Sequence, residues 1–151
     1  MGNQNGSKTN LGTAARAGLA GAITATALNE LGKRTLSQPP RMDIVGERAL
    51  AGGMQALGMK PPAGRKLFNL TLAGDLISNS AYYSLVGFGD PSGAWQRGTV
   101  LGAAAGLGAA LLPQRLGLGR DANAATPSTK ALAFALYMVA GLSAAAVTSR
   151  S

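Results

Sequence analysis

Residues 67–89 read LFNLTLAGDLISNSAYYSLVGFG, and Asp75 is the only Asp, Glu, Lys or Arg among them. The stretch lies between the basic pair Arg65-Lys66 and Asp90. About 20 apolar residues in a helix cross the hydrocarbon core of a bilayer. A carboxylate near the middle of such a helix raises the free energy of membrane insertion, so its presence indicates a functional or structural role. The stretch therefore predicts a transmembrane helix that carries one polar site.

Two further uncharged stretches, residues 98–114 and 131–149, approach the spanning length. An earlier stretch has an uncharged interior but carries Arg16 and Glu30 near its ends, which makes it the weakest of the set. We predict an all-α integral membrane protein, a small bundle of four transmembrane helices. The predicted spans are about residues 11–32, 67–88, 95–113 and 128–149.

Residues 42–57 differ in kind from the spans, because they are shorter and carry charges on one face. On a helical wheel Met42 and Val45 fall on one side, and Asp43 and Glu47 on the other. This pattern predicts a short amphipathic interfacial helix, or a solvated connecting helix packed on the bundle. Residues 1–10 are expected to be a flexible polar tail, and residues 11–151 a single membrane-embedded helical domain.

Turn and helix-breaking residues set the expected connections. The Gly, Asp and Pro residues of 89–93 predict a short turn, and so an antiparallel hairpin of the second and third spans. Pro113 is expected to end the third span, and the sequence Thr126-Pro127-Ser128 to begin the last.

The composition favours a membrane protein over a soluble bundle. The chain has 151 residues, of which only 13% are charged, and its mean hydropathy of +0.14 is modest because the apolar stretches are rich in Ala and Gly. A soluble helical bundle needs more charge on its outer faces. Cysteine and histidine are absent, which excludes thiolate chemistry, the common zinc and haem ligands and the usual catalytic base.

The net charge of +8 indicates a preferred orientation of the protein in a membrane rather than nucleic-acid binding, since no aromatic residues are interleaved with the basic ones. Basic residues favour the cytoplasmic side of a membrane. Ten of them lie in the two connections at 33–66 and 115–130, against four on the opposite side. We therefore predict that both termini lie outside the cytoplasm, and the Ala, Gly and Arg usage of the chain is typical of a small bacterial inner-membrane protein. The ten are Lys33, Arg34, Arg41, Arg48, Lys60, Arg65, Lys66, Arg115, Arg120 and Lys130, and the four are Lys8, Arg16, Arg97 and Arg150.

A polar stripe surrounds the carboxylate of the second span. Helical spacing places five polar residues on one side of this helix: Thr71, Asp75, Ser78, Asn79 and Tyr82. Such a face turns to the bundle interior or to a water-filled cavity. Three hypotheses follow: a hydrogen-bond network that holds the bundle together, a protonatable site for a cation or substrate, and a docking site for a partner subunit.

Small residues repeat at every fourth position of the third span, at Gly98, Gly102, Gly106 and Ala110. Residues this small let two helix backbones approach closely, so the stripe predicts a helix–helix contact within the chain or with another copy. The first span offers similar rows of alanine and glycine.

No nucleotide-binding, nucleophilic or metal-binding motif is present, so we expect no enzyme activity, cofactor or metal. The leading hypothesis is a non-enzymatic membrane protein that acts as a helix-packing or accessory subunit. Its expected partners are the lipid bilayer and other membrane subunits or itself, with no nucleic acid. The alternative is a small oligomeric transporter or channel with Asp75 as its ion- or proton-binding group. A holin-like pore former fits less well, because the polar stripe is confined to one helix.

Overall fold

The computed structural model describes residues 11–119 and 126–151, which form five α-helices and two short 3₁₀ turns with no strand among them. The predicted tail at residues 1–10 lies outside the described residues. In chain order the elements are α1 (Leu11–Thr35), α2 (Met42–Ala56), α3 (Arg65–Ser84), η1 (Leu85–Gly87), η2 (Pro91–Gly93), α4 (Ala94–Arg115) and α5 (Pro127–Thr148).

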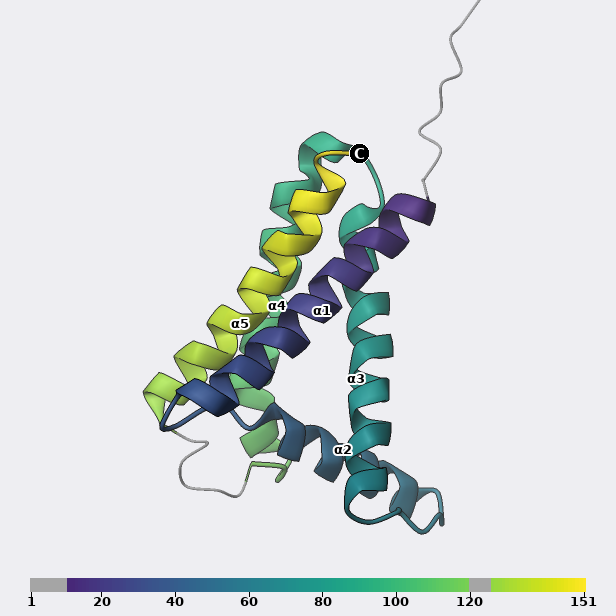
Figure 1. Ribbon diagram of the computed structural model, residues 1–151, viewed down its shortest axis with the longest axis vertical. Helices are drawn as coiled ribbons and strands as arrows, with labels where there is room; N and C mark the ends of the chain where they lie inside the picture. Colours follow the sequence, from purple (N-terminus) through teal and green to yellow (C-terminus); the bar gives the residue numbers. More distant parts are fainter. Residues whose placement is uncertain (1–10, 120–125) are drawn as a thin grey trace, which may run out of the picture.

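The four long helices, α1, α3, α4 and α5, alternate in direction along the molecule (Figure 1). The start of α1 and the C-terminus lie at one end, and α2 lies across the other. Helix α5 packs along α4 and α1, and α1 packs in turn along α3. The fold is thus a helical bundle with one short helix across its end.

Within the described residues, the α3 and α4 helices of the predicted hairpin are joined at its tip. There the Tyr82 hydroxyl donates to the Leu101 carbonyl at 2.8 Å, and Arg97 Nε donates to the Val86 carbonyl at 3.0 Å. Beyond the tip, α4 follows α5 and α3 follows α1, so the two hairpin helices diverge (Figure 1). A short turn fixes where two helices begin but does not fix the angle between them.

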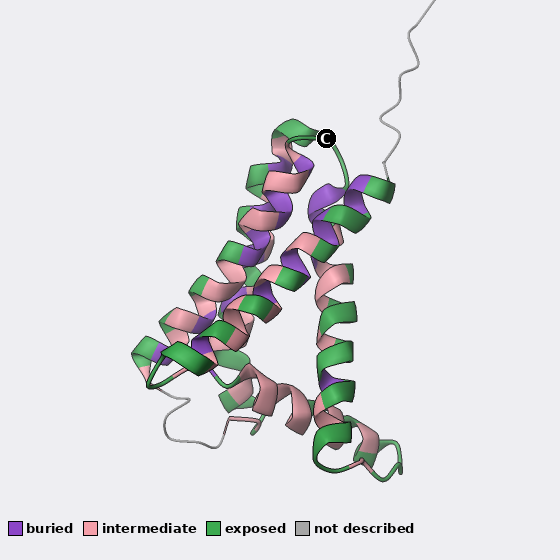
Figure 2. Ribbon diagram, viewed as in Figure 1, coloured by how far each residue is buried: buried purple, intermediate pink, exposed green. Residues whose placement is uncertain are grey.

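The core is made of small residues, and the large apolar side chains lie outside. Among the described residues no Leu, Ile, Met, Phe or Trp is buried; the largest fully buried side chains are Tyr83, Val86, Thr148 and Pro40. The rest of the apolar core is alanine. Large residues such as Ile77, at 71% exposure, point outward. Figure 2 shows the buried positions on the facing sides of α1, α4 and α5, whereas α2 and most of α3 are exposed or half-buried.

Helix α4 does not end at Pro113, contrary to the prediction from sequence. It continues to Arg115 and closes at Gly117, whose φ of +70° only glycine adopts easily. The Leu118 amide donates to the Pro113 carbonyl at 2.7 Å, and the Gly117 amide to the Gln114 carbonyl at 3.3 Å. Proline lacks an amide hydrogen but still accepts, so it fits in the last turn of a helix that a glycine terminates.

Two other helices also end at residues different from those predicted from the sequence. Helix α1 continues past Lys33 and Arg34 to Thr35, and α3 ends at Ser84, after which the chain makes a 3₁₀ turn. The last helix begins as expected, with the Thr126 side chain accepting from the Thr129 amide at 3.2 Å.

Only α5, of the helices in the described part of the chain, is long and apolar enough to qualify as a membrane span by length and hydropathy. The expected four spans are therefore not confirmed by this criterion. The other long helices contain charged residues, as in α1, polar residues, as in α3, or many Ala and Gly, as in α4.

Candidate functional site: a carboxylate between two cavities

A large open cavity lies where α3 and α4 diverge. Its volume is about 570 Å³. Helix α2 covers one end of it, and Asp75 lies in the α3 wall. The α4 wall presents small residues on a face different from the glycine stripe: Ala104, Ala105, Gly108 and Ala109.

A second, much smaller cavity of about 40 Å³ lies on the other side of Asp75. Four helices enclose it. Its polar lining comes mainly from α1 and α3, and α2 and α5 complete the wall with Met42, Asp43, Leu136 and Tyr137. Asp75 and Asn79 line both cavities, so the carboxylate lies between a large open space and a smaller, less open one.

The structure places all five residues of the predicted polar stripe at these two cavities. Thr71, Asp75 and Asn79 line the small cavity, and Asp75, Ser78, Asn79 and Tyr82 line the large one. Thr71 is only 5% exposed. The Ser78 hydroxyl donates to the Asp75 backbone carbonyl at 3.3 Å and is not directed to the carboxylate.

The Asp75 carboxylate forms no hydrogen bond or ion pair with any residue that the structure describes. Gly46 of α2 lies opposite it: a Cβ at this glycine would stand 2.7 Å from Thr71 Cγ2 and 3.4 Å from Asp75 Oδ2. The absence of a side chain at Gly46 therefore lets α2 approach the carboxylate closely. Arg16, at the other end of α1, donates to the Gly12 carbonyl at 3.3 Å.

Two other polar atoms near the carboxylate are also buried without a partner in the described chain, Asn29 Oδ1 and Thr71 Oγ1. Sequence reasoning missed Asn29 and Tyr137, which reach the site from α1 and α5. A signal for Asn29 was present, because it continues the row of small residues Ala22 and Ala25 on α1 at helical spacing.

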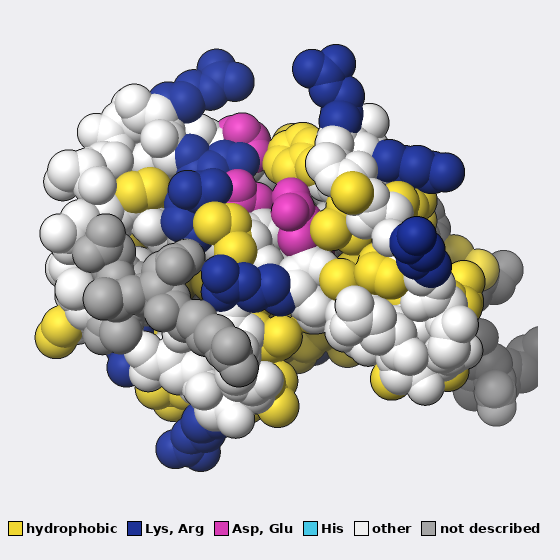
Figure 3. Space-filling model, turned by 90° about the horizontal axis from the view of Figure 1, so that it is seen from below, with side chains coloured by type: hydrophobic (Ala, Val, Ile, Leu, Met, Phe, Trp, Pro, Cys, Tyr) yellow, Lys and Arg dark blue, Asp and Glu magenta, His cyan; other side chains and the backbone are white. Residues whose placement is uncertain are grey.

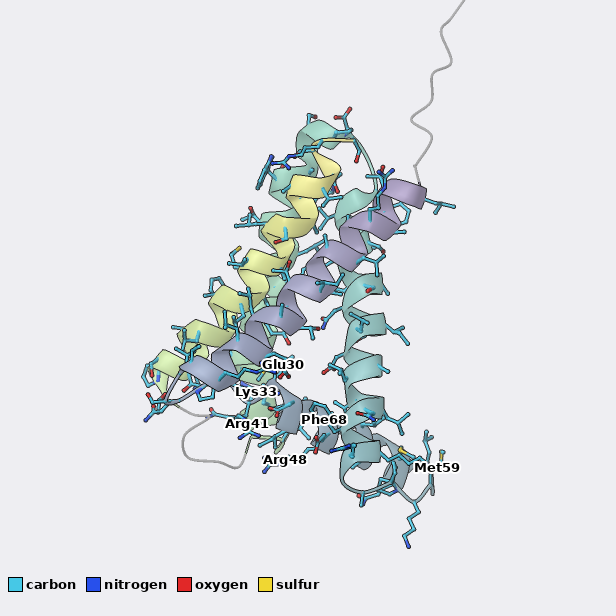
Figure 4. The ribbon with its side chains drawn as sticks, in the orientation of Figure 1. Glu30, Lys33, Arg41, Arg48, Met59 and Phe68 are labelled. Atoms are coloured by element: carbon cyan, nitrogen blue, oxygen red, sulfur yellow. The ribbon has the colours of Figure 1, made fainter. Side chains whose placement is uncertain are left out.

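A compact charge cluster borders the small cavity. Lys33 pairs with Glu30 on its own helix and with Asp43 of α2 at 3.5 Å, and Arg41 binds both Asp43 carboxylate oxygens at 3.1 and 3.2 Å. The Lys33 ammonium also lies 5.6 Å from the centre of the Phe68 ring. Figure 4 shows the labelled side chains of Glu30, Lys33 and Arg41 together near Phe68. The two acids and two bases balance, so Asp75 is the remaining carboxylate among the residues that line the small cavity.

Burial raises the pKa of Asp43, but the Arg41 hydrogen bond and the Lys33 charge outweigh burial, so the pKa lies below its ordinary value of 3.8. Asp43 is therefore ionised at neutral pH and links the end of α1 to the start of α2. At the same end, Arg48 donates to the Leu118 carbonyl at 2.7 Å and ties α2 to the segment after α4. Seen from this end, acidic side chains lie in the middle and basic ones around them (Figure 3).

The predicted glycine stripe lies against α5 of the same chain. A Cβ at Gly98 would meet the Gly141 carbonyl oxygen at 2.5 Å, one at Gly102 the Met138 Cα at 3.1 Å, and one at Gly106 the Phe134 carbonyl oxygen at 2.8 Å. These three glycines are buried, whereas Ala110 is half-buried and lines a separate cavity of about 20 Å³. On α1, Gly18 and Gly21 allow the same close approach to α3, at Ser80 and Tyr83.

Comparison with protein-family models, curated proteins and solved structures finds no match to this chain.

Proposed function

We propose that the protein is a non-enzymatic integral membrane protein in which α1, α3, α4 and α5 all cross the bilayer. The observation that carries the proposal is the distribution of apolar residues: alanine and glycine make up most of the interior, and no leucine or isoleucine of the described chain is buried. In water this arrangement would leave the strongest apolar groups solvated. In lipid it is favourable, because small residues allow close helix packing and large ones contact the acyl chains.

Helix lengths and charges support this topology. The four helices have 20 to 25 residues, which at a rise of 1.5 Å gives about 30–38 Å, enough for the hydrocarbon core. Most basic residues lie at the end that α2 covers, which we assign to the cytoplasmic face of a bacterial inner membrane. Helix α2 then lies at the interface, and both termini lie outside the cytoplasm.

Within the membrane we assign the protein the role of a helix-packing or accessory subunit. Its α4 has two faces of small residues: α5 covers the glycine stripe, and the second face lines the open cavity beside α3. A groove lined by small residues suits a helix of a partner subunit, and Asp75 in its wall supplies a polar anchor for that helix.

Crosslinking from the groove tests the subunit role. A photoreactive residue at Ala105, in the groove, should give one protein adduct of defined mass in native membranes. The control position is Ile23, which is 58% exposed and lies outside the groove. Lipid adducts alone at both positions would show that the groove holds lipid, and the subunit proposal would fail.

A second candidate function, ion or proton transport in an oligomer, is favoured by one observation: the Asp75 carboxylate lines the open cavity and has no partner in the described chain. Asp75→Asn keeps the shape and removes the charge. Coupled flux in reconstituted vesicles should collapse in this variant while the fold survives. Wild-type vesicles without flux for protons and a panel of cations would count against transport.

A further inference from the structure

The small cavity between α1 and α3 has the chemistry of a cation site rather than of a packing void. Its lining includes the side chains of Thr26, Asn29, Thr71, Asp75 and Asn79, all of which carry oxygen atoms. Thr71 is 5% exposed, and its Oγ1 has no partner among the described residues; the same holds for Asn29 Oδ1. Buried polar atoms in native proteins are nearly always satisfied, so two unsatisfied oxygens at one cavity indicate a bound ion or water.

We propose that this cavity binds a monovalent alkali cation, Na⁺, held by the Asp75 carboxylate, Thr71 Oγ1 and Asn29 Oδ1. Carboxylate, hydroxyl and amide oxygens are the ligands that hard cations prefer. Thr71 and Asp75 are four residues apart and share one face of α3, and Asn29 reaches the same cavity from α1. The cation would thus connect the two helices at the point where neither oxygen has another partner.

The local charge balance selects a monovalent ion. Glu30 and Asp43, which also line the cavity, are neutralised by Lys33 and Arg41. Asp75 contributes one further negative charge, which one Na⁺ cancels. A divalent ion would leave an excess positive charge in a partly buried site beside Lys33, which is unfavourable. No group of three or more acidic or metal-binding side chains occurs in the described chain.

The size of the cavity agrees with this ligand. A water molecule needs about 10–15 Å³ of such volume. The 40 Å³ cavity therefore holds one Na⁺ with one or two waters that complete its coordination. Gly46 of α2, which lines the large cavity, lies close to two of the site's residues: a Cβ there would stand 2.7 Å from Thr71 Cγ2 and 3.4 Å from Asp75 Oδ2.

The test is the sodium dependence of thermal unfolding of the purified protein in detergent, with choline chloride replacing NaCl at constant ionic strength. A ligand that binds only the folded state raises the Tm as its concentration passes the Kd. The Tm of the wild type should therefore rise with NaCl and not with choline. Binding of ²²Na⁺ to the wild type gives an independent measure of the same affinity.

Three variants locate the site. Asp75→Asn should lose the sodium response, and Thr71→Val, which keeps the shape and removes Oγ1, should weaken sodium binding by about tenfold. Ser78→Ala is the matched control on the same helix, since Ser78 lines only the large cavity, and it should respond as wild type does.

The same Tm in Na⁺ and choline for the wild type would overturn the proposal, whatever the variants do, and would leave water as the occupant. A sodium response retained in Asp75→Asn, or stabilisation by Ca²⁺ in place of Na⁺, would also overturn it. Sodium binding and the subunit role are tested independently. Sodium binding can be absent while a partner still crosslinks at Ala105, and crosslinking can be absent while the protein still binds sodium.

Discussion

Gly98→Ala tests whether α4 and α5 are in contact through their backbones. The added Cβ would lie 2.5 Å from the Gly141 carbonyl oxygen and 2.7 Å from Ala145 Cβ, whereas ordinary contacts begin near 3.4 Å. The helices must therefore separate locally by almost 1 Å. Overpacking of this kind costs about 1–3 kcal/mol, and the higher helix propensity of alanine returns up to about 1 kcal/mol. We expect a net loss of about 1–2 kcal/mol.

The assay is thermal unfolding in detergent, where this loss corresponds to a fall in Tm of roughly 2–8 °C for a chain of this size. Gly108→Ala is the matched control on the same helix, because its Cβ would meet only the flexible end of Leu112 at 3.5 Å. It should unfold at or slightly above the wild-type temperature. Alanine substitutions at the three stripe glycines should lower the Tm in the order of their closest contacts: most at Gly98, less at Gly106 and least at Gly102.

Equal unfolding temperatures for Gly98→Ala and Gly108→Ala would refute the reasoning. Such a result would mean that α5 does not lie against the stripe, and that the glycines reflect the composition of the chain alone.

Three further predictions concern the hydrogen bonds, the charges and the topology. Tyr83→Phe removes the hydroxyl that donates to the Tyr137 carbonyl at 3.0 Å and should lower the free energy of unfolding by about 1 kcal/mol, measured by denaturation in detergent. Asp43→Asn should destabilise the protein by up to about 1 kcal/mol at neutral pH. Because the folded-state pKa of Asp43 is lowered, the ionised carboxylate stabilises the fold above pH 3.8, and this stabilisation is lost as the pH falls below 3.8. The Tm values of wild type and variant should therefore converge at low pH. A pH-independent gap between their Tm values would contradict this. Reporter fusions should place residue 151 outside the cytoplasm and residue 60 inside it, and a cytoplasmic C-terminus would remove one of the four proposed spans.

The pattern of residues along the chain predicted all five α-helices of the described structure. The helices expected at 11–32, 42–57, 67–88, 95–113 and 128–149 correspond to α1, α2, α3, α4 and α5, because runs of residues with few charges between basic and turn-forming segments mark helices whatever surrounds them. The end of α4 was misplaced because Pro113 was weighed as a breaker, whereas Gly117 four residues later closes the helix.

The candidate site was predictable on one helix only. Spacing placed Thr71, Asp75 and Asn79 on a single face, since that follows from the geometry of one helix. It could not show that Asn29 of α1 and Gly46 of α2 lie opposite that face, because those contacts depend on how separate helices pack. The partner of the glycine stripe was undetermined for the same reason, and only the three-dimensional packing identifies α5.

The contacts at the tip of the α3–α4 hairpin hold one end of α3 in place, so a tilt of α3 would displace its other end most. Arg97 fixes the pivot through the Val86 and Asp90 carbonyls, at 3.0 and 2.9 Å. Helix α3 extends about 30 Å from this pivot, so a tilt of about 5° moves its far end by roughly 3 Å and Asp75, near its middle, by about half as much. The same tilt carries α2, which packs on α3. A tilt of α3 at the tip would therefore change the width of the groove at the α2 end of the bundle.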